Sequence, residues 1–133
     1  LAQRPVPPKD PNAPVVDRLA TLEKDLIPVG KQVPDFDLPQ ADGTRINLYK
    51  ALAGKKATLI NFWFHGCPPC RRELPELQKM YEELKDKGFQ IIAVNRGDSP
   101  EVVGRFWNES GFTFPHVLGG TGAEYQKIGK PYG

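Results

Sequence analysis

Cysteine and histidine are scarce in this chain, and long apolar runs are absent. Its 133 residues include only two cysteines and two histidines, His65 and His116. A structural zinc site takes about four Cys or His ligands at regular spacing, and the chain lacks the second cysteine pair that would supply them. No apolar run approaches the ~20 residues that a membrane-spanning helix needs. We therefore expect no structural zinc site and no such helix.

A surplus of charge of either sign is lacking as well. The 18 Lys and Arg residues nearly balance the 16 Asp and Glu residues, which leaves a formal net charge of +2. This balance does not indicate a surface for nucleic acid. A chain of this length buries roughly two thirds of its unfolded surface, enough for one domain. It begins with Leu rather than Met and shows no signal-peptide pattern, so we expect an excised or mature product.

The chain does contain one closely spaced cysteine pair, in the motif Cys67-Pro68-Pro69-Cys70. The preceding residues 57–64 are mostly apolar, β-branched or aromatic, which is typical of a buried strand. Proline is favoured in the first turn of a helix, so the motif predicts a junction between a strand and a helix. Thiols there lie at the positive end of a helix dipole, which favours the thiolate.

A purely structural disulfide is the alternative interpretation of this pair. Closing so short a loop removes little entropy from the unfolded chain, so such a bond would stabilise little. A redox-active pair that follows a strand in a strand-helix context is favoured. The sequence thus predicts a site that gains and loses two electrons.

The part of the chain before the motif predicts a tether and a small hairpin. Residues 1–14 carry five prolines, and apolar residues at helical spacing follow them. We expect residues 1–28 to form a Pro-rich tether and a short amphipathic helix. Residues 33–38 and 44–48 read as two strands of a hairpin around the turn at Asp42-Gly43.

The part from residue 57 onward predicts strands that alternate with helices. The expected strands are 57–64, 89–94 and one within 112–118, and the expected helices are 68–87, 100–110 and 121 toward 130. This β-α-β-α-β order predicts a parallel sheet with right-handed crossovers.

Five segments of the chain follow one another in a characteristic order. They are Val33-Pro34-Asp35-Phe36-Asp37-Leu38 with Asp42-Gly43, Asn61-Phe62-Trp63, Cys67-Pro68-Pro69-Cys70-Arg71, Glu73-Leu74-Pro75 and Ile91-Ile92-Ala93-Val94-Asn95. Together they resemble thioredoxin-like oxidoreductases of the TlpA/ResA type, in the AhpC/TSA-redoxin superfamily. The resemblance covers residues 29–133. It implies an α/β thioredoxin-like fold with a central sheet, flanking helices and an N-terminal β-hairpin extension.

The resemblance also implies an activity and a location. Such proteins reduce disulfides in partner proteins, take electrons from a reducing protein donor and need no cofactor or metal. They are extracytoplasmic bacterial proteins, periplasmic or tethered to the membrane by an anchor that would lie outside this chain. Cytochrome c maturation is a frequent pathway for them.

Two departures from the family pattern concern the surroundings of the cysteines. The family usually carries Trp just before the first cysteine, where this chain has Phe64-His65-Gly66, so the usual aromatic wall beside the thiol is missing. The chain stops at Pro131-Tyr132-Gly133, before the family's cis-proline loop, hairpin and final helix. We expect the C-terminal part of the fold to be truncated in this sequence.

The two cysteines take different roles in this interpretation. Cys67, at the helix end, is expected to attack, and Cys70, one turn on, to resolve the mixed disulfide. Pro68 and Pro69 shape the backbone and remove two N–H donors, which leaves the Cys70 N–H for the Cys67 thiolate. We therefore expect a Cys67 pKa moderately below the ~8.5 of a free thiol and a reducing potential, roughly like thioredoxin's ~−270 mV.

Neighbouring polar residues have both functional and ordinary interpretations. Glu73 resembles an acidic position that assists proton transfer in ResA-like proteins, or is a solvated helix charge. Asn61 occupies the place of a buried Asp in thioredoxins and, as an amide, cannot accept the resolving thiol's proton. His65 would lower the Cys67 pKa when protonated, or is an exposed loop histidine. Trp63 and Gly66 shape the site, and Trp63 is expected in the core.

Other functions stay open at this point. A disulfide donor or isomerase would use the same pair. A peroxiredoxin-type peroxidase with antioxidant activity wants Thr three residues before its cysteine, where Phe64 stands. A copper-handling module would use Cys67, Cys70 and a histidine, and an adaptor would use the fold alone.

Overall fold

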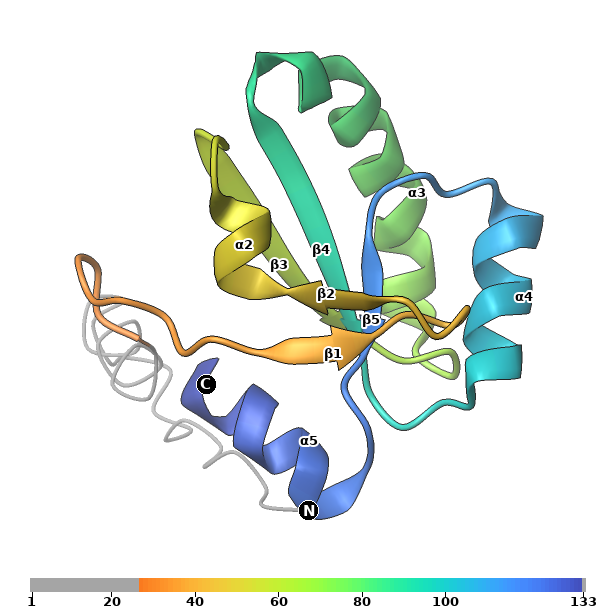
Figure 1. The fold of residues 1–133 in the computed structure, drawn as a ribbon. Coiled ribbons are helices and arrows are strands. Elements are labelled where there is room, and N and C mark those ends of the chain that lie inside the picture. Colours follow the sequence, from red (N-terminus) through yellow and green to blue (C-terminus); the bar gives the residue numbers. More distant parts are fainter. Residues whose placement is uncertain (1–26, 133) are drawn as a thin grey trace, which may run out of the picture.

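Three parallel strands form the centre of the structure, a computed structural model that describes residues 27–132 (Figure 1). Strand β3 (Ala57–Trp63) pairs with β4 (Phe89–Asn95), and β4 pairs with β5 (His116–Leu118), in both cases parallel. The predicted β-α-β-α-β order and its parallel sheet are confirmed. The tether and amphipathic helix expected within residues 1–28 lie, up to residue 26, outside the described residues.

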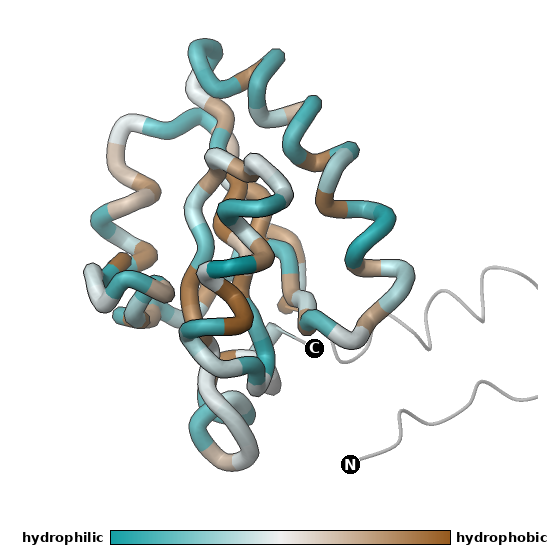
Figure 2. The backbone as a smooth tube through the Cα atoms, turned by 90° about the vertical axis from the view of Figure 1, so that its right-hand side faces the viewer, coloured by the Kyte–Doolittle hydropathy of each residue, from teal (hydrophilic) through white to brown (hydrophobic). Residues whose placement is uncertain are grey.

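Strand β4 lies between the two others and is buried along almost its whole length. Ile91 and Ala93 face one core cluster, while Ile92 and Val94 face the other. This alternation follows from the two-residue repeat of a strand, and it explains why the sequence reads as a continuous apolar run rather than an alternating one. In Figure 2 brown segments gather along these central strands.

Helix α3 (Pro68–Leu84) packs its apolar face against the first cluster. Leu74 and Leu77 are buried, and fully burying a leucine stabilises a fold by about 1.5–3 kcal/mol. The helix is shorter than the predicted 68–87, since its last turn tightens into the 3₁₀ segment η1 (Lys85–Lys87). Gly88 then takes a left-handed conformation with φ of 89°, which glycine adopts without steric cost.

Helix α4 (Pro100–Ser110) covers the same face of the sheet and begins and ends as predicted. The Ser99 hydroxyl accepts the Val102 N–H at 3.3 Å, as an N-cap should. Val103 and Trp107 are buried, but Val102, expected on the apolar face, is 37% exposed. Adjacent helical residues point about 100° apart, so only one of two neighbouring valines can face the core.

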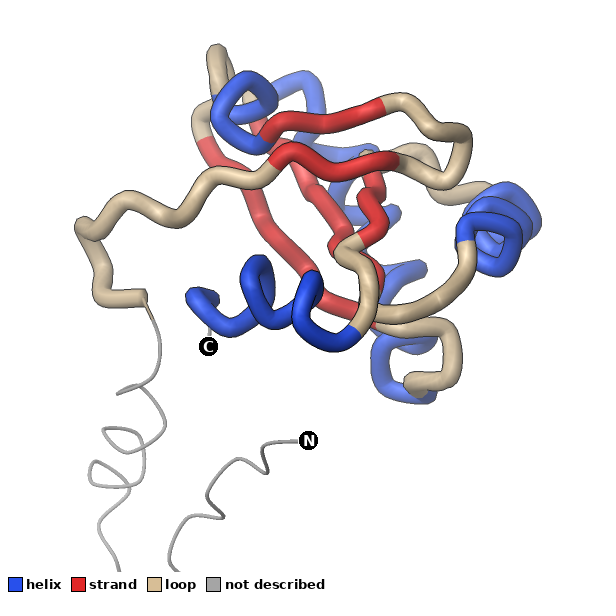
Figure 3. The backbone as a smooth tube through the Cα atoms, turned by 60° about the horizontal axis from the view of Figure 1, so that its bottom comes forward, coloured by secondary structure: helices blue, strands red, loops and turns tan. Residues whose placement is uncertain are grey.

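The predicted hairpin is present, with shorter strands than expected. β1 (Asp37–Pro39) and β2 (Arg45–Asn47) pair antiparallel, and Figure 3 shows them lying across the parallel strands. Leu48, expected in the second strand, instead opens the short helix α2 (Leu48–Leu52), which the sequence analysis missed. The Asn47 side chain accepts the Lys50 N–H at 3.0 Å, and this N-cap ends the strand.

His116, in β5, links the parallel sheet to the hairpin by a hydrogen bond. Its Nε2 accepts the Ala41 N–H at 3.3 Å, and its ring lies 4.8 Å from the Trp107 indole. Burial lowers the His116 pKa, although the nearby Asp42 carboxylate acts in the opposite direction. A neutral ring suits this contact, since Nε2 must keep a free lone pair to accept.

The last helix, α5 (Gly122–Gly129), covers the second face of the sheet and continues into the 3₁₀ segment η2 (Lys130–Tyr132). Phe62 packs against Tyr125 and Tyr132, with ring centroids 6.3 and 5.6 Å away. The Tyr132 hydroxyl donates to the Pro34 carbonyl at 2.6 Å, and burial raises the pKa of Tyr132 to about 12. Among the described helices, none has the length and apolar character to cross a membrane.

Candidate active site

Cys67 and Cys70 form a disulfide where β3 gives way to α3. Their Cα atoms lie 5.3 Å apart, and both residues are half-buried. Cys67 is the N-cap residue of α3, and its Sγ accepts the Cys70 N–H at 3.3 Å. The sequence prediction of a strand-to-helix junction at this pair is confirmed.

The first turn of α3 offers few donors to the sulfur of Cys67. Pro68 and Pro69 occupy its first two positions and carry no N–H. The Cys70 N–H therefore makes the hydrogen bond to Cys67 Sγ that the sequence analysis expected. Cys67 is also tied to the loop before it, because its N–H donates to the Phe64 carbonyl at 3.2 Å.

A second set of hydrogen bonds holds this loop to the end of β4. The Asp98 Oδ2 atom accepts the His65 N–H at 2.7 Å and the Asn95 Nδ2–H at 2.7 Å. In return, the Asp98 N–H donates to Asn95 Oδ1 at 3.1 Å, and the Arg96 N–H donates to the Trp63 carbonyl at 2.9 Å. The carboxylate of Asp98 thus positions the backbone two residues before Cys67.

Sequence reasoning missed Asp98 and Asn95. The signal that could have found them is the spacing Asn-x-x-Asp directly after the second parallel strand. Asn and Asp side chains bind local backbone N–H groups, and the carboxyl ends of adjacent parallel strands meet at one edge of a sheet. Asn95 is 1% exposed, so its amide needs partners inside the fold.

Trp63 and His65 lie in an aromatic layer beneath the site. Trp63 is 1% exposed and packs against Phe106 and Trp107, with centroids 5.3 and 5.4 Å away. Its predicted place in the core is confirmed. His65 is half-buried rather than an exposed loop residue, because its ring meets the edge of Phe106 at 5.3 Å. The Arg71 guanidinium also lies over Phe106, at 5.3 Å.

Glu73 lies one helical turn beyond Cys70 and faces β3. Its Oε1 accepts the Asn61 Nδ2–H at 3.2 Å, while Asn61 Oδ1 is buried without a hydrogen-bond partner. The structure therefore brings together Glu73 and Asn61, which the sequence analysis considered separately. Glu73 itself is exposed, so its carboxylate can exchange protons with solvent.

The histidines do not join the cysteine pair in a metal-binding cluster among the described residues. Within residues 27–132, no three His, Cys, Asp or Glu side chains group as they would around a metal ion. His116 contacts the hairpin and Trp107, and His65 packs on Phe106. The arrangement offers dithiol-disulfide chemistry through the two cysteines.

The sequence of this chain matches a known protein family. Residues 29–129 match the model described as AhpC/TSA family. The chain belongs to the AhpC/TSA family. The chain is 40% identical over 96 residues to a thiol-disulfide oxidoreductase ResA from Halalkalibacterium halodurans. The match covers 72% of this chain and 53% of that protein. This similarity agrees with the TlpA/ResA resemblance of the motifs.

Other relatives point the same way. A thiol-disulfide oxidoreductase ResA from Bacillus subtilis is 39% identical over 95 residues, which are 71% of this chain and 52% of that protein. The thioredoxin domain of a thiol-disulfide oxidoreductase from Bacteroides vulgatus superposes with a TM-score of 0.69 at 29% identity, over 80% of this chain and 74% of that domain. The predicted thioredoxin-like α/β fold is confirmed. The chain spans about half the length of the curated relatives it matches.

In this AhpC/TSA-family chain, Asp98→Ala should loosen the loop before Cys67. The His65 and Asn95 N–H groups lose their shared acceptor, and we expect the free energy of unfolding to fall by about 1–3 kcal/mol. The measurement is urea unfolding of the oxidised protein. Asp86→Ala, which removes an exposed carboxylate from η1, is the control and should change stability little. Equal loss in both variants would contradict the role of Asp98.

Proposed function

We propose that this chain is a thiol-disulfide oxidoreductase that reduces disulfides in partner proteins through Cys67 and Cys70. The observation that carries the proposal is the disulfide at the N-terminus of α3, with Cys67 as its N-cap. A sulfur in that place can form a thiolate and lies at the end of the helix rather than within it. Relatives named thiol-disulfide oxidoreductase support the same chemistry.

The exchange proceeds in two balanced steps. In the reduced protein the Cys67 thiolate attacks one sulfur of the partner's disulfide, which forms a mixed disulfide and releases the partner's other sulfur as a thiolate. The Cys70 thiolate then attacks Cys67 Sγ, which forms the Cys67–Cys70 disulfide and releases the second partner thiolate. Two electrons pass from the protein's dithiol to the partner. A reducing protein dithiol returns them in the reverse sequence.

Glu73 is proposed to receive the proton that the Cys70 thiol must lose before it attacks. It lies one turn beyond Cys70 on α3, and Asn61 holds one of its oxygens through an N–H donor. Asn61 cannot take this proton itself, because an amide is not a base at neutral pH. Trp63, His65, Gly66, Pro68 and Pro69 are proposed to shape the site rather than to react.

The proposal includes the cellular location, the pathway and the partners of this activity. The resemblance to TlpA/ResA proteins supports work outside the cytoplasm, in the periplasm or tethered to a membrane by an anchor beyond this chain. It also supports cytochrome c maturation as the pathway. Protein disulfides would be the substrates and a reducing protein the donor.

The roles of the cysteines predict an asymmetric trapping pattern. Cys70→Ser should accumulate mixed disulfides through Cys67 when it meets a disulfide-bonded protein, because no resolving thiol remains. Cys67→Ser should accumulate none. Non-reducing electrophoresis followed by peptide mapping measures the trapped species. Trapping through Cys70 in the Cys67→Ser protein would reverse the two roles.

The proton-transfer role of Glu73 predicts a change in the pH–rate profile. Glu73→Gln should slow disulfide exchange by about 10-fold. This is less than the ~100-fold or more that general acid–base catalysis typically contributes, because solvent reaches this carboxylate. Its pH dependence should shift as well, whereas unfolding should hardly change. Glu76→Gln, an exposed acid on the same helix that pairs with Lys79 at 3.2 Å, is the matched control. Identical profiles for both variants would leave Glu73 as a surface charge.

The scarcity of donors around Cys67 predicts a reducing potential. The Cys70 N–H is the donor at Cys67 Sγ, so we expect only moderate thiolate stabilisation and a potential near ~−270 mV, roughly that of thioredoxin. Equilibration with dithiothreitol buffers and quantification of free thiols gives the value. A potential near the ~−120 mV of strong oxidants would instead favour a disulfide donor or isomerase.

A further inference from the structure

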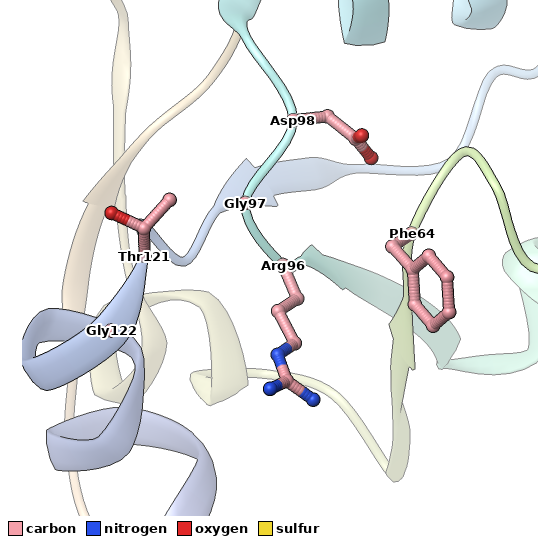
Figure 4. A pocket seen from close by; sticks show the side chains of 6 residues that line it. All are labelled: Phe64, Arg96, Gly97, Asp98, Thr121 and Gly122. Carbon is pink, nitrogen blue, oxygen red and sulfur yellow. The ribbon is translucent and has the colours of Figure 1, made fainter. Parts of the chain in front are cut away.

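A pocket of about 270 Å³ lies where β3 and β4 end (Figure 4). Its lining residues come from the loop before Cys67, the loop after β4 and the start of α5, and they are Phe64, Arg96, Gly97, Asp98, Thr121 and Gly122. The reaction steps proposed above do not use this pocket. Its lining residue Phe64 connects it to the cysteine pair, since the Phe64 carbonyl accepts the Cys67 N–H.

Phe64 forms the apolar wall of the pocket. Its side chain is 43% exposed, which sets it apart from the buried aromatic residues of the core. A methyl group built on Gly66 would lie 3.9 Å from two carbons of the Phe64 ring, and the Phe64 carbonyl accepts the Cys67 N–H. The ring therefore lies against the residue that precedes Cys67 and supplies an exposed aromatic surface that Gly66 lacks.

Arg96 supplies the charged group of the pocket, and its position is restrained. Its backbone N–H donates to the Trp63 carbonyl at 2.9 Å, and its guanidinium lies over the Tyr125 ring at 5.1 Å. Tyr125 in turn packs edge-on against Phe62. A guanidinium over an aromatic ring can still donate its N–H groups to a carboxylate.

Arg96 has no ion-pair partner among the described residues, since within residues 27–132 no carboxylate oxygen lies within 4 Å of its guanidinium nitrogens. Figure 4 shows the Arg96 side chain pointing away from Asp98, whose Oδ2 already accepts two N–H groups. Glu124 Oε2 lies against Gly120, 2.7 Å from where a methyl group on that glycine would stand. Within the described residues, the pocket thus presents a guanidinium without an ion-pair partner beside the apolar ring of Phe64.

We propose that this pocket receives the segment that flanks the reacting cysteine of a partner protein, and that Arg96 selects a carboxylate side chain in it. Phe64 provides the apolar surface on which that segment rests. The inference rests on the proposed disulfide-exchange function and names the class of substrate: disulfides with an Asp or Glu close to the cysteine. Arg71, held over Phe106 on α4, adds positive charge to the same end of α3.

The charge preference has a limited expected size. An arginine–carboxylate pair can form two parallel hydrogen bonds, but exposure to water and salt weakens such a pair at a surface. We expect peptide disulfides with Glu two residues from cysteine on either side to exchange about 5-fold faster than peptides with Gln there. Peptides with Lys should be slower than those with Gln. High salt should shrink the differences.

Stopped-flow exchange of the reduced protein with these three peptide disulfides tests the inference. Arg96→Gln should abolish the preference for Glu, so that the Glu and Gln peptides exchange at equal rates. Arg105→Gln, which removes an exposed positive charge from α4 outside the pocket, is the matched control and should keep the preference. Phe64→Ser should slow exchange with all three peptides in similar proportion.

The outcomes separate the inference from the function on which it rests. Equal rates with all three peptides in the wild-type protein would overturn the selection by Arg96 while exchange itself stands. A preference for Glu that survives in Arg96→Gln, or that Arg105→Gln also loses, would overturn the assignment to this pocket. Exchange with none of the peptides would overturn the proposed function, and the selection with it.

Discussion

The Asp98 carboxylate joins the two central strands at the point where the disulfide sits. One of its oxygens accepts the His65 N–H on the β3 side and the Asn95 amide on the β4 side, each at 2.7 Å. Since two donors share one charged acceptor, both bonds belong to the stronger class of hydrogen bond. The turn from Phe64 to Cys67, the N-terminus of α3 and the wall of the adjacent pocket all take their place from this link.

Strand β3 contacts different parts of the molecule with its two faces. Trp63, at its end, is buried among Phe106 and Trp107, so the strand cannot rotate or slide without opening the aromatic layer. Asn61, two residues earlier, points from the same face toward α3 and binds Glu73. The period of two along a strand therefore places a rigid anchor and a polar partner for the helix on one face. The opposite face carries Phe62, which supports Tyr125 and, through it, Arg96.

The sequence predicts the elements whose signals are local. Two prolines at the start of α3, Gly88 after it and the Ser99 cap of α4 each act within a few residues, and all three lie where expected. The start of α2 was missed, because a five-residue helix carries almost no periodicity and depends on the Asn47 cap. At the site, the cysteine pair could be recognised from its spacing. Asp98 had only a weak local signal, the Asn-x-x-Asp spacing after β4. Its bond to the His65 N–H depends on the pairing of β3 with β4, which the spacing does not reveal.

The same constraint explains how an acid and a base two residues apart take different partners. The net charge of +2 spreads over the whole molecule, but Asp98 is turned inward to backbone and amide donors. Arg96, two residues before it, is turned outward onto Tyr125. The acid that fixes the loop therefore forms no ion pair with the base beside it, because the geometry of the loop directs them to different partners. Composition cannot reveal that Asp98 and Arg96 have different partners. The hydrogen bonds at the ends of β3 and β4 make this arrangement a consequence of the fold.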